Sequence, residues 1–159
     1  MLPISDFSIY LMYNNQLKIK TMFTKTNLIS TIVAAVWSFM GGFLFWGILA
    51  EDFMNNHLGT ATGMGKEMPD FGLLAFGCLV QAFAFSSIFR SWGSDSYTPM
   101  DGLKYGIWAG ILVGFGHGLI NHATTNFLDM TGSVVNGFIY IVFYAVMGLL
   151  VGLIYKKVK

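Results

Sequence analysis

The chain alternates between long apolar runs and short polar connections. Four runs carry almost no charge, and they cover about residues 28–50, 71–90, 102–126 and 134–155. A helix rises about 1.5 Å per residue, so each run is long enough to cross the roughly 30 Å hydrocarbon core of a bilayer. The pattern therefore predicts an all-α, polytopic membrane protein, a bundle of four transmembrane helices.

Composition supports this fold class and narrows the partners. Only 11% of the 159 residues are charged and 55% are hydrophobic, whereas a soluble domain carries about 25% charged residues. A formal net charge of +1 gives no indication of nucleic-acid binding. The expected partners are the lipid bilayer and either a second copy or another membrane protein. One cysteine, Cys78, and three histidines fit no zinc-ligand spacing, so neither a metal nor a cofactor is expected.

Residues 1–27 form a weakly apolar leader. Its lysines, Lys18, Lys20 and Lys25, follow the apolar stretch, whereas a secretory signal carries positive charge before it. Met22 is a plausible start of translation. If translation starts there, the residues before Met22 are an upstream extension. We expect the leader to be disordered, poorly packed or on the membrane surface, and the membrane domain to cover residues 28–159.

Basic residues predict the orientation. They occur in the leader, on either side of the turn at 91–101, and in the tail that ends with Lys159. The connection at 51–70 and the turn at Asp129 are acidic on balance. Because Lys and Arg mark the cytoplasmic side of a membrane, both termini are expected in the cytoplasm.

Small residues recur along the third and fourth runs. The glycines expected to pack helices together are Gly102, Gly106, Gly110, Gly114 and Gly118, with Gly148 and Gly152 on the fourth run. Small residues allow two helix backbones to approach closely in a membrane. A four-residue spacing drifts by about 40° per step around an α-helix, so the partner helix should cross at an angle. Gly110→Leu or Gly114→Leu should therefore disrupt the bundle far more than Gly59→Leu in the loop.

Polar side chains gather in the outer half of the third run. They are His117, Asn121, His122, Thr125 and Asn126, and the acidic pair Glu51 and Asp52 could face them across the mouth of the bundle. His117, Asn121 and Thr125 share one helix face because they are four residues apart. Polar residues at membrane depth indicate a functional site, but interhelical hydrogen bonds, worth about 0.6 kcal/mol each, would explain the same residues. Both interpretations stay open.

Catalytic chemistry finds no support in these runs. No Asp or Glu lies inside an apolar run, so an acid–base pair is missing, and His117 and His122 on one helix cannot ligate a haem from both sides. We expect no catalytic residue and a non-enzymatic membrane protein that binds a partner or a small ligand in the outer half of the bundle. The alternative is a small transporter or channel-like oligomer that uses the polar face of the third helix, although no internal repeat supports it.

Several segments carry a resemblance to a known family. They are GGFLFWGILAEDF in the first run, NNHLGTATGM in the loop after it, and Ala123, Thr124, Thr125 and Asn126 near the end of the third run. From Asn27 onward the chain resembles a domain of unknown function found in small bacterial four-helix integral membrane proteins. The resemblance implies a multi-pass protein of the bacterial inner (plasma) membrane and implies no reaction.

Overall fold

The computed structural model describes residues 22–63, 66, 68–92 and 97–158. The described residues are about 83% helical, and they contain no strand beyond one isolated bridge between Leu58 and Leu128. The leader expectation for residues 1–21 lies outside the described residues.

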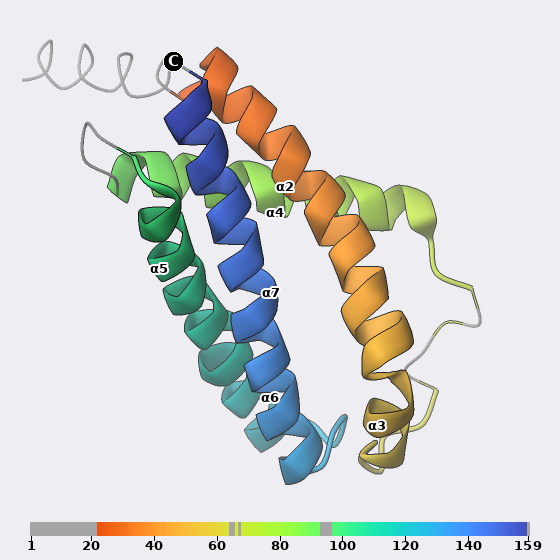
Figure 1. The fold of residues 1–159 in the computed structure, drawn as a ribbon. Coiled ribbons are helices and arrows are strands. Elements are labelled where there is room, and N and C mark those ends of the chain that lie inside the picture. Colours follow the sequence, from red (N-terminus) through yellow and green to blue (C-terminus); the bar gives the residue numbers. More distant parts are fainter. Residues whose placement is uncertain (1–21, 64–65, 67, 93–96, 159) are drawn as a thin grey trace, which may run out of the picture.

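Four helical rods make up the fold (Figure 1). The first is α2 (Lys25–Leu44), which continues as the π-helix η1 (Phe45–Leu49). The second is α4 (Phe71–Trp92). The third joins α5 (Pro99–Gly110), the π-helix η2 (Ile111–His117) and α6 (Gly118–Thr124). The fourth is α7 (Met130–Lys157). Each rod is long and apolar enough to cross a membrane, so the predicted all-α, multi-pass fold class is confirmed.

Side-chain caps set the helix starts. The Thr98 hydroxyl accepts from the Asp101 N–H and the Asp101 carboxylate accepts from the Thr98 N–H, a reciprocal cap that satisfies two backbone donors. Asp129 caps α7, which therefore begins four residues before the predicted 134. The short helix α3 (Glu51–Asn56) was not predicted, because its polar sequence gave no apolar run.

The rods are not all parallel. Figure 1 shows the α5–η2–α6 rod lying beside α7, with α2 on the other side, while α4 runs across them at a steep angle. Only the second half of α4 is covered by other helices, through residues such as Ala82, Phe85 and Phe89. Its first half exposes large apolar side chains, including Phe71 and Phe76, as expected of a surface in contact with lipid.

Glycine brings α5 and α7 into backbone contact. A Cβ at Gly102 would lie 2.0 Å from the carbonyl oxygen of Gly148, and one at Gly106 would lie 2.1 Å from that of Tyr144. A Cβ at Gly110, Gly114 or Gly152 would also come within 3.0 Å of the partner backbone. The predicted close packing therefore holds at these positions.

Gly118 departs from this pattern. A Cβ there would meet nothing nearer than the Val113 oxygen at 4.0 Å, so its predicted packing role is wrong. Between Gly110 and Gly118 the rod passes through η2, whose turns are wider than those of an α-helix. The residues beyond η2 are therefore rotated relative to a continued α-helix, and the glycine series leaves the α7 interface.

Backbone hydrogen bonds join the loop after α3 to the turn between α6 and α7. The Gly59 N–H donates to the Phe127 oxygen at 2.9 Å, and the Ala61 N–H donates to the Asn126 oxygen at 3.1 Å. A Cβ at Gly59 would lie 2.0 Å from that Asn126 oxygen. The expected difference between Gly59 and the helix glycines Gly110 and Gly114 therefore has no steric basis, because a Cβ at each of the three would come within 3.0 Å of backbone atoms.

A buried hydrogen-bond network ties the inner ends of three rods together. Asn27 is fully buried. Its Oδ1 accepts from the Ser86 hydroxyl at 2.6 Å and the Tyr155 hydroxyl at 2.8 Å, while its Nδ2 donates to the Ser87 hydroxyl at 3.0 Å. Nearby, Arg90 donates to the Thr24 hydroxyl. Placing Asn27 in a poorly packed leader was wrong, since α2 already begins at Lys25.

Candidate functional site

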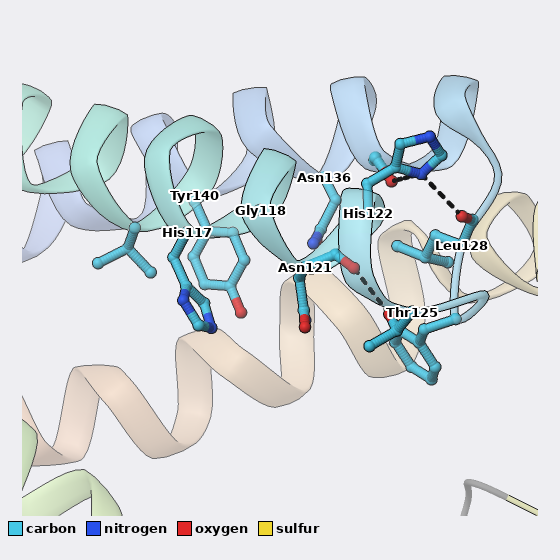
Figure 2. A pocket seen from close by; sticks show the side chains of 11 residues that line it. His117, Gly118, Asn121, His122, Thr125, Leu128, Asn136 and Tyr140 are labelled. Atoms are coloured by element: carbon cyan, nitrogen blue, oxygen red, sulfur yellow. Dashed lines mark hydrogen bonds between the residues drawn. The ribbon is translucent and has the colours of Figure 1, made fainter.

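A cavity of about 130 Å³ opens between the third rod and the N-terminal half of α7. Figure 2 shows it from close by. The lining residues are Val113, His117, Gly118, Asn121, His122, Thr125, Phe127, Leu128, Ser133, Asn136 and Tyr140. Its volume is close to the roughly 150 Å³ of a cavity that accepts benzene. The space therefore suits a molecule of about five or six heavy atoms.

Two rods supply the polar side chains. His117 ends η2, and Asn121 follows four residues later on α6, on the same face. Asn136 and Tyr140 have the same four-residue spacing on α7. Because residues four apart on a helix are neighbours, each rod presents a pair of polar groups to the cavity, and Figure 2 shows the four side chains converging.

Three of these groups have no protein partner. Across the described ranges, no hydrogen bond forms to the His117 imidazole, the Asn121 carboxamide or the Tyr140 hydroxyl. His117 and Asn121 are exposed although they lie within an apolar rod long enough to span a membrane. An unsatisfied polar group facing lipid costs several kcal/mol. Water or a polar ligand in the cavity would satisfy all three.

Asn136 is held by the first rod. The indole N–H of Trp46 donates to Asn136 Oδ1 at 2.7 Å, and the Trp46 ring packs on Tyr140 with 4.7 Å between centroids. Asn136, Tyr140 and Ser133 were not predicted as site residues. Their spacing of three and four residues on the outer half of the fourth run was the signal that could have found them.

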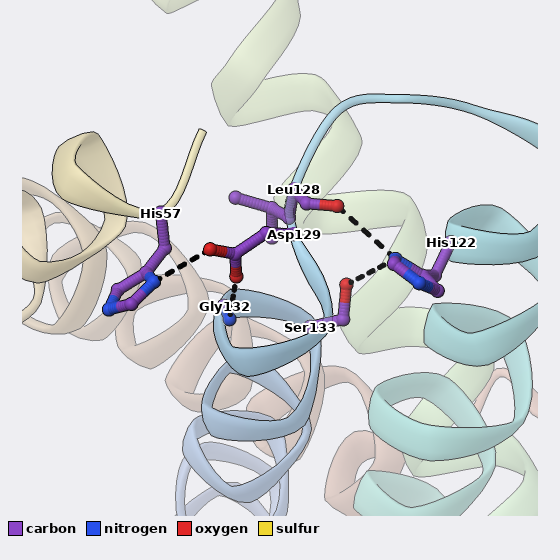
Figure 3. Close-up of polar contacts among 6 residues, drawn as sticks. All are labelled: His57, His122, Leu128, Asp129, Gly132 and Ser133. Carbon is purple, nitrogen blue, oxygen red and sulfur yellow. Dashed lines mark hydrogen bonds and ion pairs between the residues drawn. The ribbon is translucent and has the colours of Figure 1, made fainter. Parts of the chain in front are cut away.

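His122 is mainly a structural residue. Figure 3 shows its Nδ1 facing the Leu128 carbonyl at 3.2 Å and the Ser133 hydroxyl at 3.3 Å. These contacts tie α6 to the turn that follows it and to the start of α7. For His122, interhelical hydrogen bonding is the interpretation that the geometry favours.

The remaining predicted site residues divide. Thr125 lines the cavity and donates its hydroxyl to the Asn121 backbone oxygen at 2.9 Å. Asn126 does not line it, because the helix ends at Thr124 and Asn126 turns toward Gly59. Glu51 and Asp52 do not face the cluster either, so that prediction was wrong. They are exposed in the first turn of α3, where carboxylates favour the positive end of the helix dipole.

Outside the cavity, a contact between His57 and Asp129 connects the end of α3 to the start of α7 (Figure 3). The Gly132 N–H donates to Asp129 Oδ1 at 2.7 Å, and His57 Nδ1 lies 2.9 Å from Oδ2. The backbone hydrogen bond from Gly132, followed by the one from His57, holds the pKa of the Asp129 carboxyl below its ordinary value of 3.8. The sequence did not predict that His57 and Asp129 form a pair, because they are 72 residues apart in the chain.

This carboxylate predicts a pH effect on stability. A carboxyl with a lowered pKa stabilises the fold above its unfolded-state value, and that contribution is lost as the pH falls through the folded-state value. The melting temperature of the wild type should therefore fall as the pH drops from about 5 to below the ordinary carboxyl pKa of 3.8. Asp129→Asn keeps an acceptor for the Gly132 N–H but does not titrate, so its loss should be smaller. Melting curves in detergent measure both, and equal losses would contradict the assignment.

Comparison with known proteins finds no match. No protein-family model, no curated protein and no solved structure is similar to this chain. The cavity geometry is therefore the basis for the function proposed below.

Proposed function

We propose that the chain is a non-enzymatic, multi-pass membrane protein that binds a small, uncharged polar ligand in the cavity between the third rod and α7. The supporting observation is the convergence of His117, Asn121, Asn136 and Tyr140 on one cavity of about 130 Å³. These groups offer hydrogen bonds and no Asp, Glu, Lys or Arg charge. The ligand would need both a compact shape and at least one polar atom.

The side chains that follow the cavity toward the C-terminal end of α7 favour ligand binding over transport of a ligand through the bundle. One helical turn further along α7 from Tyr140, the buried Phe143 packs against Trp37 and Trp46, with ring centroids 5.9 and 5.2 Å apart. The next turn carries Met147, which is fully buried. A ligand in the cavity would meet a closely packed aromatic wall, which supports a receptor or binding role.

The same proposal includes an orientation. Lys25, Arg90 and Lys156 belong to the end with the Asn27 network, while Asp129 and Glu51 belong to the end with the cavity. The positive-inside tendency supports cytoplasmic termini and a cavity on the outer side. The family resemblance supports a location in the inner membrane of a bacterium. A second copy of the chain could cover part of the lipid-facing surface in that membrane.

Binding of N,N-dimethylformamide, which has five heavy atoms and is uncharged, tests the proposal. We expect saturable shifts of the Asn121 amide signals in ¹⁵N NMR spectra of the detergent-solubilised chain. His117→Ala should raise the dissociation constant about three- to tenfold, the effect of one hydrogen bond, while the melting temperature stays near that of the wild type. Thr124→Ala is the matched control, because its side chain bonds only to backbone of its own helix and lies outside the cavity. Equal binding by all three proteins, or none by the wild type, would reject the proposal.

A further inference from the structure

The Asn136 carboxamide has one end already occupied. An indole N–H can donate a hydrogen bond and cannot accept one. Trp46 Nε1, 2.7 Å from the Asn136 side chain, therefore pairs with the carboxamide oxygen and not with its nitrogen. This chemistry alone settles which way round the carboxamide lies.

The other end of Asn136 then faces the cavity. Figure 2 shows its amide nitrogen pointing toward the space beside Asn121 and Tyr140. Nδ2 has two N–H donors, and within the described part of the chain neither finds an acceptor. The wall of the cavity therefore presents a fixed pair of donors at this position.

The other free groups impose no such direction. A tyrosine hydroxyl both donates and accepts, and a neutral imidazole does so through its two nitrogens. The Asn121 carboxamide has no partner that fixes its orientation. Of the four converging groups, Asn136 is therefore the one whose hydrogen-bonding sense is set by a protein partner.

We propose that Trp46 is a specificity-determining positioning residue and that the ligand carries a hydrogen-bond acceptor, such as a carbonyl, amide or ether oxygen, which binds to Asn136 Nδ2. This inference rests on the proposed function, because it assigns the ligand class of the same cavity. Trp46 acts through Asn136 and does not itself line the cavity. A ligand with only donors would displace water from the Asn136 donors without replacing its hydrogen bonds, which is unfavourable.

Two probes of equal size separate the possibilities. N,N-dimethylformamide has an acceptor oxygen and no donor, whereas pyrrole has one N–H donor and no comparable acceptor. We expect the wild type to bind the first more tightly, and Trp46→Phe to reduce this preference about three- to tenfold, because the freed carboxamide can turn its oxygen to the cavity. Phenylalanine keeps an aromatic ring against Tyr140, so packing is largely retained.

Trp37→Phe is the matched control. It removes an indole N–H that also makes one hydrogen bond, to the Phe143 backbone oxygen at 3.0 Å, but it does not touch Asn136. Its probe preference should equal that of the wild type. A merely structural role for Trp46 would instead weaken both probes equally in Trp46→Phe, leave their ratio unchanged, and overturn the inference.

A second variant keeps the test decisive if Trp46→Phe does not fold. Asn136→Ala removes the donor pair directly and should weaken N,N-dimethylformamide while pyrrole binding is retained. Equal weakening of both probes would again overturn the inference. Absence of saturable binding of either probe to the wild type would instead reject the proposed function itself, so the two failures are distinguishable.

Discussion

Gly106→Ala is expected to destabilise the contact between α5 and α7 strongly, although it adds only one methyl group. The new Cβ would lie 2.1 Å from the Tyr144 carbonyl oxygen on α7, and real Cβ atoms essentially never come within 3.0 Å of such an atom. The α5 and α7 backbones would therefore have to separate by about 1 Å. Overpacking of this kind costs about 1–3 kcal/mol and occasionally more.

Unfolding in a titration with sodium dodecyl sulfate, followed by circular dichroism, measures this loss. Gly106→Leu should leave no folded protein, because a branched side chain cannot fit between touching backbones. Gly118→Ala on the same rod is the control, since its Cβ meets nothing nearer than 4.0 Å and alanine is the better helix former. Equal stability of Gly106→Ala and Gly118→Ala would refute the close approach of the two helices.

This contrast between two glycines of one series shows how far sequence reasoning reaches. The four-residue spacing correctly predicted that Gly102 to Gly114 face a partner helix, because spacing on an α-helix fixes the face. The spacing gave a wrong prediction at Gly118, because a π-helix has wider turns than an α-helix. The apolar sequence of Ile111–His117 contains no signal that predicts a π-helix. The same rotation decides which polar residues beyond η2 reach the cavity.

Only one of the two walls of the candidate site was predicted from the sequence. His117, Asn121 and Thr125 were found because they interrupt an apolar run at a spacing of four residues. The other wall, formed by Asn136 and Tyr140, belongs to a different rod, and contact between rods depends on tertiary packing that one sequence does not reveal. Glu51 and Asp52 were misplaced because they lie exposed in the first turn of α3, a helix that the sequence did not predict.

Serine residues in the second run illustrate the same limit. By residue type alone Ser86 and Ser87 carry little information, since serine in a membrane helix often bonds only its own backbone. In the structure both are buried and bonded to Asn27. The meaning of these hydroxyls depended on where α2 begins, and the chain up to Asn27 had been assigned to the leader.

The Asn27 network gives the second large effect. Asn27→Ala removes the partner of three hydroxyl groups, Ser86, Ser87 and Tyr155, at a site shielded from both water and lipid. Hydrogen bonds between membrane helices average about 0.6 kcal/mol and reach about 1.7 kcal/mol. With several lost together, we expect a destabilisation of about 2 kcal/mol. Asn55→Ala, at an exposed position of α3, should change stability by less than about 0.5 kcal/mol.

A double-mutant cycle separates the network from simple loss of packing. Tyr155→Phe removes only the hydroxyl that donates to Asn27 Oδ1 at 2.8 Å, so alone it should cost up to about 1.7 kcal/mol. In Asn27→Ala that hydroxyl has lost its principal acceptor. Tyr155→Phe should therefore cost at least about 0.5 kcal/mol less in Asn27→Ala than in the wild type. Strictly additive losses would mean that the two side chains stabilise the bundle independently. Coupling would show that the Asn27 end of α2 is joined to the C-terminal end of α7 through this side chain, away from the N-terminal half of α7 that lines the cavity.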